Sequence, residues 1–215
     1  MKTNRAILLA AISLSFTACS TVKYNTLEKI GIHKRDILVS DVKEARDAQK
    51  DAQGQFQDAL ERFGTVIEIE ETNLKKAYNR LKDEYDDSVD AAEDVSDEIN
   101  DVEKVAGDLF NEWESEIKQY SDANLRRDSQ SKLSDTQARY KQMLSSMKAA
   151  EASMQPVLAT FKDNVLYLKH NLNAQAVGSL RGTFNNLEGD IERLVDKMNQ
   201  SIERSNDFIA QMKTS

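Results

Sequence analysis

The chain has 215 residues with one proline and seven glycines, and so few helix breakers point to an almost entirely helical protein. The formal net charge is -8, from 29 basic and 37 acidic residues, and no basic patch carries interleaved aromatic residues. This charge excludes the class of proteins that bind nucleic-acid phosphates. Hydrophobic residues at 40% suffice for one narrow core, and the length fits one domain.

Residues 1–18 have the pattern of a secretory signal peptide. Lys2 and Arg5 precede an apolar run over residues 6–16, which is too short to span a bilayer because spanning needs about 20 apolar residues. The run ends in Phe16-Thr17-Ala18-Cys19, which resembles a bacterial lipobox but has Phe16 where Leu is usual.

Cys19 is the only cysteine of the protein, so it has no partner for a disulfide. The lipobox resemblance implies that Cys19 becomes the lipidated N-terminus, with several acyl chains (palmitate among them) that anchor it stably. Ser20 stands where Asp would indicate inner-membrane retention, so we expect a protein of the cell envelope, anchored in the outer membrane and facing the periplasm. The alternative is a stray cysteine in an ordinary cleaved signal.

A tether over residues 19–36 precedes a helical domain over residues 37–215. Its first predicted helix lies near 38–63, with Ser40 as N-cap and Gly64 as its end. Its seam repeats every three and a half residues, as in a coiled coil: Val42, Ala45, Gln49, Ala52, Phe56, Ala59 and Phe63.

The second predicted helix, near 73–120, is long and has Thr72 or Asn73 as its cap. At 1.5 Å per residue it is about 70 Å long, and it needs partner helices to cover its seam. That seam is Leu74, Tyr78, Leu81, Tyr85, Ser88, Ala92, Val95, Ile99, Val102, Ala106, Leu109, Trp113 and Tyr120.

The third and fourth predicted helices lie near 122–170 and 174–213. Pro156 lies inside the third, where it predicts a kink rather than a turn because the heptad phase carries through it. Gly178 and Gly182 predict close backbone approach or a loose first turn. The seams are Leu133, Thr136, Tyr140, Met143, Met147, Ala150, Met154, Val157, Phe161 and Leu168, then Leu180, Phe184, Leu187, Ile191, Leu194, Met198, Ile202, Ser205, Ile209 and Met212.

Short links between long helices predict an all-α fold, an elongated antiparallel up-down bundle or coiled coil of about four helices, with the first helix shorter than the middle two. Asn171 tolerates the left-handed conformation that ends a helix, and Asn173 can cap the next one. The alternating directions place the turn near Tyr120 at the membrane end with His33, and His170 at the far end. Because the seams match, a monomer or weak homo-oligomer is expected.

Residues 83–116 carry 15 acidic residues and one base, Lys104. This run could be a cation site or a docking surface for a basic partner, or a solvated face that sets helix register. Seven bases lie over residues 118–148. Folding back at Tyr120–Ser121 would set Lys148 beside Asp94 and Arg139 beside Glu103. The solvated face is favoured because one heptad phase puts the aspartates opposite the seam: Asp83, Asp87, Asp90, Asp94, Asp97, Asp101 and Asp108.

No pattern of catalysis or of cofactor binding occurs. The histidines are His33 and His170, and neither HExxH, GxGxxG nor GxxxxGK[ST] is present. We therefore expect no enzyme, no catalytic residues, no metal and no cofactor. The seam aromatics and methionines are interpreted as core rather than as the lining of a ligand cavity.

Three stretches, Lys29–Leu38, Tyr120–Asp128 and Val165–Ala174, resemble an uncharacterised family of Gram-negative helical lipoproteins, known only as a domain of unknown function. The resemblance implies a helical envelope protein and brings no activity. It leaves two hypotheses: a structural or protein-interaction module with an unidentified envelope partner, or a periplasmic binding module for a lipid or other hydrophobic ligand. The candidate interaction turn comprises Tyr120, Ser121, Asp122, Asn124, Arg126 and Arg127, and the candidate helix-end site His170, Asn171 and Asn173.

Overall fold

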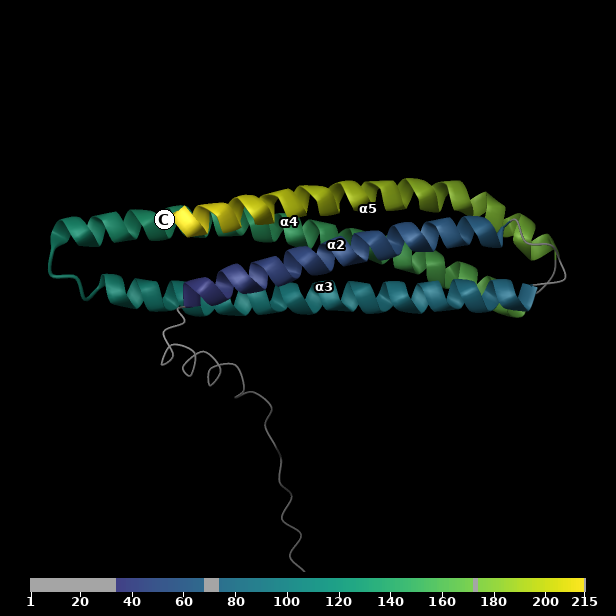
Figure 1. Cartoon of the computed structure of the whole chain (residues 1–215), viewed down its shortest axis with the longest axis horizontal. Helices are drawn as coiled ribbons and strands as arrows, with labels where there is room; N and C mark the ends of the chain where they lie inside the picture. Colours follow the sequence, from purple (N-terminus) through teal and green to yellow (C-terminus); the bar gives the residue numbers. More distant parts are fainter. Residues whose placement is uncertain (1–33, 68–73, 172–173, 215) are drawn as a thin grey trace, which may run out of the picture.

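The computed structural model describes residues 34–67, 74–171 and 174–214, and these form four long helices side by side in an elongated rod (Figure 1). With the labels of Figure 1, they are α2 (Lys34–Val66), α3 (Leu74–Ile117), α4 (Ala123–His170) and α5 (Ala174–Thr214). The predicted all-α bundle of four antiparallel helices is confirmed, as is the shorter first helix, with 33 residues against 44 in α3 and 48 in α4.

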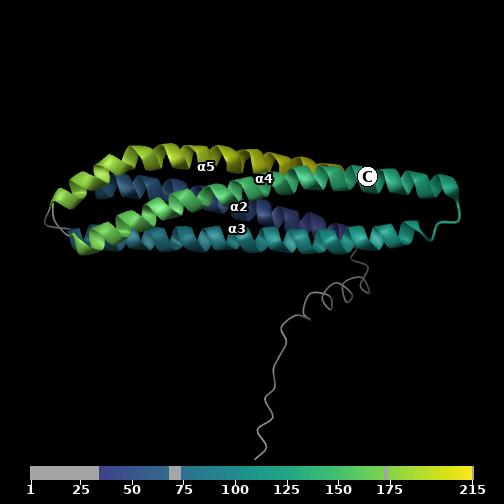
Figure 2. The ribbon, with the colours of Figure 1, turned by 180° about the vertical axis from the view of Figure 1, so that it is seen from behind.

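Each helix packs on its neighbours in sequence, and α5 closes the bundle by packing on α2. Viewed from behind, α4 lies between α5 and α3 over half of the rod (Figure 2). Short links force each helix to run opposite to the one before it. Among the described residues, no helix has the length and apolar character needed to cross a bilayer.

The predicted seams of the first and third helices form the core of the rod. All seven seam residues of α2 are buried, and so are all ten of α4. The helix α4 continues through Pro156 without a turn. Three rings make the core near one end: Phe63 lies 6.1 Å from Phe161 and 5.8 Å from Phe184, centroid to centroid.

The predicted seam of α3 is wrong at Tyr78 and Tyr85. Ala77 and Glu84 are buried there, whereas Tyr78 and Tyr85 are only partly buried. The helix packs on both α2 and α4, so its buried stripe is wider than a single heptad seam. The small Ala77 fits between helices, while the larger tyrosine rings remain at its edge. In α5, Phe184 and Ile202 are likewise half-buried, and Ser201 and Phe208 are buried instead.

The ends of α2 differ from the prediction. The helix begins at Lys34, so Lys34–Asp36 belong to it and not to the tether, and Ser40 lies inside it with its hydroxyl bonded to the Glu44 carboxylate at 3.2 Å. Gly64 does not end the helix, because the buried Val66 continues the seam. The predicted caps Thr72 and Asn73 lie outside the described residues.

The register of α3 and α4 also differs from the prediction. Lys148 pairs with Glu103 at 2.7 Å, not with Asp94, and Arg139 donates to Gln211 of α5 at 3.0 Å. The prediction assumed a tight turn centred on the link. Instead, the link extends along the rod axis, so that α4 begins farther out than α3 ends (Figure 1).

A polar layer crosses the core in the middle of the rod. The Gln49 amide of α2 is fully buried, accepts from the Ser201 hydroxyl at 2.7 Å and donates to the Met147 carbonyl at 3.4 Å. A buried amide with partners on two other helices penalises any shifted alignment, since a shift would leave it unpaired. This layer therefore sets how α2, α4 and α5 align.

Glu84 is the buried carboxylate of the core, with 6% of its surface exposed. Burial raises its pKa above the ordinary 4.5, and the guanidinium of Arg62, 3.0 Å away, opposes that rise. The folded chain therefore holds a proton that the unfolded chain has lost as pH rises past 4.5. The free energy of unfolding falls with rising pH across this window.

Glu84→Gln is expected to remove this pH dependence. The difference in free energy of unfolding between the variant and the natural chain should grow in favour of the variant from about pH 4 to about pH 7, because the amide does not ionise. Urea unfolding followed by circular dichroism at both pH values measures the change. Asp83→Asn, at the exposed neighbouring carboxylate, is the control. A parallel shift of both variants with pH would contradict the assignment to Glu84.

Candidate interaction site at the projecting end

Two of the four helices project past the ends of the other two. The first residue of α2, Lys34, pairs with Glu112 of α3 at 2.9 Å, so the rest of α3 lies beyond α2. Near the last turn of α5, Gln211 accepts from Arg139 of α4, so the preceding turns of α4 lie beyond α5. We call residues 113–133 the overhang. Figure 1 shows it as a helical hairpin beyond the C-terminus.

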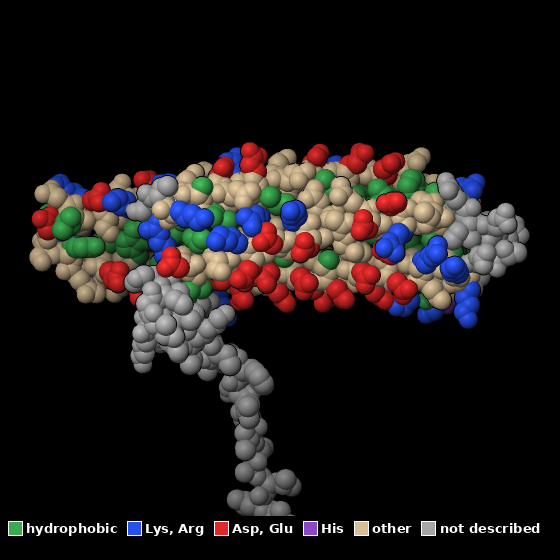
Figure 3. Space-filling view, viewed as in Figure 1, with side chains coloured by type: hydrophobic (Ala, Val, Ile, Leu, Met, Phe, Trp, Pro, Cys, Tyr) green, Lys and Arg blue, Asp and Glu red, His purple; other side chains and the backbone are tan. Residues whose placement is uncertain are grey.

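Among the described residues, no second pair of helices covers the inner face of the overhang. Ile117 and Leu133 are buried between its two helices, and the Trp113 indole donates to the Ser129 hydroxyl at 2.9 Å across them. Trp113 itself and Leu109 are only partly buried. Hydrophobic side chains are visible between the two helices in Figure 3. Trp113 was predicted in the core. It is only half-buried because α2 begins at Lys34, beside Glu112, and does not extend over the indole.

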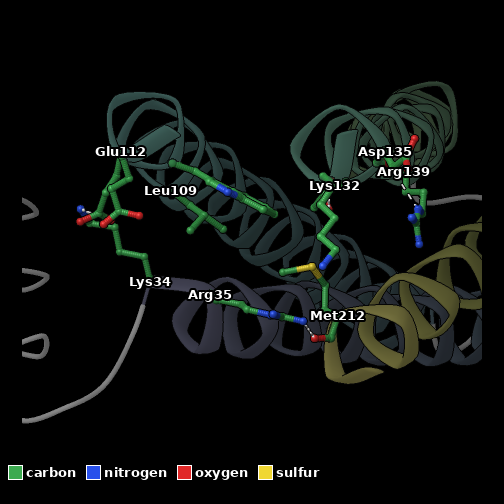
Figure 4. A pocket seen from close by; sticks show the side chains of 11 residues that line it. Lys34, Arg35, Leu109, Glu112, Lys132, Asp135, Arg139 and Met212 are labelled. Carbon is green, nitrogen blue, oxygen red and sulfur yellow. Dashed lines mark hydrogen bonds and ion pairs between the residues drawn. The ribbon is translucent and has the colours of Figure 1, made fainter. Parts of the chain in front are cut away.

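A pocket of about 490 Å³ lies where the overhang meets the ends of α2 and α5. Leu109, Trp113 and Met212 supply its apolar surface, with polar and charged side chains around them (Figure 4). This volume lies in the range of small-molecule sites, and the mixture of apolar and polar lining is typical of them. The full lining is Lys34, Arg35, Leu109, Glu112, Trp113, Glu116, Lys132, Asp135, Thr136, Arg139 and Met212.

The cations of this pocket already have protein partners. Lys34 pairs with Glu112, and Arg35 donates to the Met212 carbonyl near the end of α5. Lys132 pairs with Asp128 at 2.9 Å. Figure 4 shows Lys132 and Arg139 on the α4 side and Lys34 and Arg35 on the α2 side. Lys34 and Arg35 therefore join α2 to α3 and α5, and Arg139 joins α4 to α5, while the apolar surface stays open.

The structure brings together the residues of the predicted interaction turn. The Asp122 carboxylate caps α4 by accepting from the backbone amides of Asn124 at 2.6 Å and Leu125 at 3.1 Å. Arg126 donates to the Tyr120 carbonyl at 2.6 Å, and Arg127 donates to the Asn124 side chain at 2.6 Å. Ser121 and the other residues of the turn are exposed. Most of the hydrogen bonds described for these side chains are therefore made within the turn itself.

Asp122→Ala is expected to lower the free energy of unfolding by about 1 kcal/mol, because it removes the N-cap of α4. Thermal unfolding followed by circular dichroism measures the loss. Asp122→Ser keeps a capping oxygen and should restore most of it. Equal losses in the two variants would show that the carboxylate acts otherwise than as a cap.

Two apolar side chains are exposed at the turn. Tyr120 is 40% exposed and Leu125 57%. Tyr120 was predicted in the seam of the second helix, but α3 ends at Ile117 and leaves it in the link. The same segment carries three exposed bases, Lys118, Arg126 and Arg127, and two exposed acids, Asp122 and Asp128. The extreme end of the overhang therefore combines apolar and basic side chains.

The predicted helix-end site lies at the opposite end of the rod, where α4 ends at His170. Asn171 does cap α4, and its side chain donates to the Tyr167 carbonyl at 2.9 Å. Its φ is -129°, so it does not adopt the left-handed conformation that was predicted. His170 is exposed, and Asn173 lies outside the described residues. Leu166 and Tyr167 are exposed at this end, by 46% and 40%.

Of the two alternatives predicted for Gly178 and Gly182, close backbone approach is wrong. A Cβ at Gly178 or Gly182 would meet no neighbour within 4 Å, and both residues are exposed. A Cβ added at Gly64 would lie 3.5 Å from the Phe184 ring, which is ordinary van der Waals contact. The pocket at the overhang is an apolar opening that sequence reasoning missed. Its signal was the difference in length between the first and second predicted helices.

The acidic run of α3 forms a band along one edge of the rod (Figure 3). Six of its seven predicted outward aspartates are exposed, and Asp108 is partly buried. Within the described parts of the chain, no three His, Cys, Asp or Glu side chains gather as metal ligands would. Burial, and then the neighbouring charge of Glu44, raise the pKa of Glu98. The band is therefore a solvent-exposed face of α3, as predicted.

The four antiparallel helices and the projecting hairpin define an all-α bundle protein. A family model described as "Protein of unknown function (DUF2959)" matches residues 23–212, and the chain belongs to this family. The match covers all four helices almost entirely, and the overhang lies within it. A search of curated proteins finds no match to the chain.

Proposed function

We propose that the protein is a non-enzymatic, lipid-anchored envelope protein, a structural or protein-interaction module that faces the periplasm. One observation carries the interaction role: the bundle covers its own seam along most of the rod, but α3 and α4 continue past their partners and leave apolar surface open. Open apolar surface beside charged residues is typical of a binding surface.

The anchor rests on the sequence. The lipobox-like stretch ends at Cys19, fifteen positions before α2 begins at Lys34. Since α2 starts beside the overhang, an anchor at Cys19 would hold that end of the rod nearer the membrane. This agrees with an envelope protein whose interaction surface works close to the bilayer.

Processing at Cys19 tests the anchor. Globomycin should cause the precursor to accumulate, and Cys19→Ser should move the protein from the membrane fraction to the soluble fraction. Unchanged precursor size together with unchanged fractionation would refute lipidation.

Site-specific photo-crosslinking in cells tests the interaction role. A crosslinker at Gln130, exposed on the overhang, should give a defined adduct with an envelope protein. The matched control is the exposed Gln142, farther along α4. Adducts of equal kind and yield at both positions would contradict a partner-specific overhang.

The pocket at the overhang favours a second candidate function, a binding module for a lipid or other hydrophobic ligand. Its apolar surface and its volume of about 490 Å³ support this alternative. Native mass spectrometry of the purified chain would reveal a bound ligand. Trp113→Ala should remove that ligand if it lies in this pocket.

A further inference from the structure

We propose that the tip of the overhang, residues 118–128, contacts the surface of the bilayer that holds the lipid anchor, with anionic phospholipid as its partner. This inference rests on the lipid anchor of the proposed function and adds a second membrane contact, made by side chains. The juxtaposition that carries it is the exposed pair Tyr120 and Leu125 among exposed basic residues, at the end of the rod where α2 begins.

The apolar side chains fit an interfacial contact. Leu125 is the most exposed large hydrophobic residue among those described, and Tyr120 is 40% exposed in the same turn. A leucine side chain is stabilised at the interface between headgroups and acyl chains because its apolar surface leaves water. A tyrosine suits the same interface because its ring is apolar and its hydroxyl polar. Both lie at the extreme end of the rod, so they can reach a flat surface without a clash from the helices.

The charges of the tip favour anionic lipid. Lys118, Arg126 and Arg127 are exposed, and they outnumber the two acids there. The acid at the start of α4, Asp122, is engaged with two backbone amides. In a chain of net charge -8, residues 118–128 carry a net charge of +1. Basic residues near a surface strengthen binding to anionic headgroups, and salt weakens that term.

The geometry allows the tip and the anchor to touch one membrane. The pocket places Lys34 level with Thr136 of α4, and the thirteen residues from there back to Ala123 are about 20 Å long. Fifteen positions separate Cys19 from Lys34, and a chain of that length can reach about 50 Å. The tether is therefore long enough for the tip to reach the bilayer.

The contact need not be strong to be populated. An anchored chain holds its tip at a high effective concentration next to the membrane, so a weak contact becomes an intramolecular one. The consequence is an orientation: the rod stands on its overhang, with the end that carries His170 directed away from the membrane. The other exposed apolar pair, Leu166 and Tyr167, lies at that far end, about 60 Å along α4 from Leu125.

This far pair supplies a matched control. Lipidation consumes the thiol of Cys19, so Leu125→Cys or Leu166→Cys gives a chain with one free thiol for a polarity-sensitive fluorophore. Both replaced side chains are exposed, so neither change should unfold the bundle. The full lipidated chain is reconstituted in vesicles of phosphatidylethanolamine and phosphatidylglycerol, with and without nitroxide-labelled lipid.

The label at position 125 should be quenched several-fold by the nitroxide lipid, and the label at position 166 should not. Replacing phosphatidylglycerol by phosphatidylcholine should weaken the quenching, as should Arg126→Gln with Arg127→Gln. Equal quenching in both lipids would overturn the role of anionic lipid.

The remaining outcomes separate the two proposals. A chain that floats with the vesicles while its label at position 125 stays in water refutes the bilayer contact and leaves the anchor standing. A chain that does not float refutes both. A label at position 125 that is shielded in native membranes but not in lipid vesicles identifies a protein as the occupant, and this also overturns the proposal.

Discussion

Phe63→Ala is expected to lower the free energy of unfolding by about 3–5 kcal/mol, the usual cost of removing a buried phenylalanine. Phe63 is fully buried and is the ring of α2 that joins Phe161 of α4 to Phe184 of α5. Its removal leaves a cavity among three helices, and closely packed helices cannot easily collapse into it. The midpoint of thermal unfolding should fall by roughly 10 °C.

Urea and thermal unfolding followed by circular dichroism measure this loss. Leu166→Ala is the control, because Leu166 is 46% exposed and should change the free energy by less than about 0.5 kcal/mol. The double variant with Phe161→Ala should lose less than the sum of the single losses, because the two rings contact each other. Additive losses would show that the rings are not one packing unit.

The helices and their buried faces could be predicted because heptad spacing directly reports which side of a long helix is covered. All ten predicted seam positions of α4 are buried for this reason. The tyrosines of α3 show the limit of that reasoning. Spacing alone does not say that a helix has two neighbours, so it could not show that Glu84 would turn inward toward Arg62.

Helix register could not be predicted from the pattern, and the candidate site depends on register. A heptad repeat matches equally well after a shift of seven residues, so Lys148 had several acidic partners available. The buried amide of Gln49 sets the alignment of α2 with α4 and α5. The extended link sets the alignment of α3 with α4. The pocket exists because α2 and α5 stop where α3 and α4 continue. Matched helix ends would have closed it.

The positions of the predicted interaction turn and of the predicted helix-end site could be predicted only in part. Alternation of helix direction correctly predicted that the turn near Tyr120 and the end at His170 lie at opposite ends of the rod. His33, predicted to lie beside the turn, is outside the described residues. The exposure of Leu125 was not foreseen, since an isolated apolar residue in a helix gives no signal of its own.

Pro156 is the residue whose replacement should stabilise the protein. It lies inside the continuous helix α4 and is exposed. A proline in a helix interior removes one backbone hydrogen bond and costs about 3 kcal/mol relative to alanine. Alanine also raises the conformational entropy of the unfolded chain, and this lowers the gain in stability by about 0.4–1 kcal/mol. Pro156→Ala should therefore raise the free energy of unfolding by about 2 kcal/mol.

Thermal unfolding should show a rise of about 4–8 °C for this variant. Gln155→Ala, at the exposed neighbouring position, is the control and should leave the midpoint almost unchanged. The core near Pro156 explains how a lower midpoint could arise. Met154, Val157 and Phe161 are fully buried around it, so their packing depends on the path of α4. A lower midpoint for Pro156→Ala would show that this path requires the proline, and that the helix bends there to cover its seam.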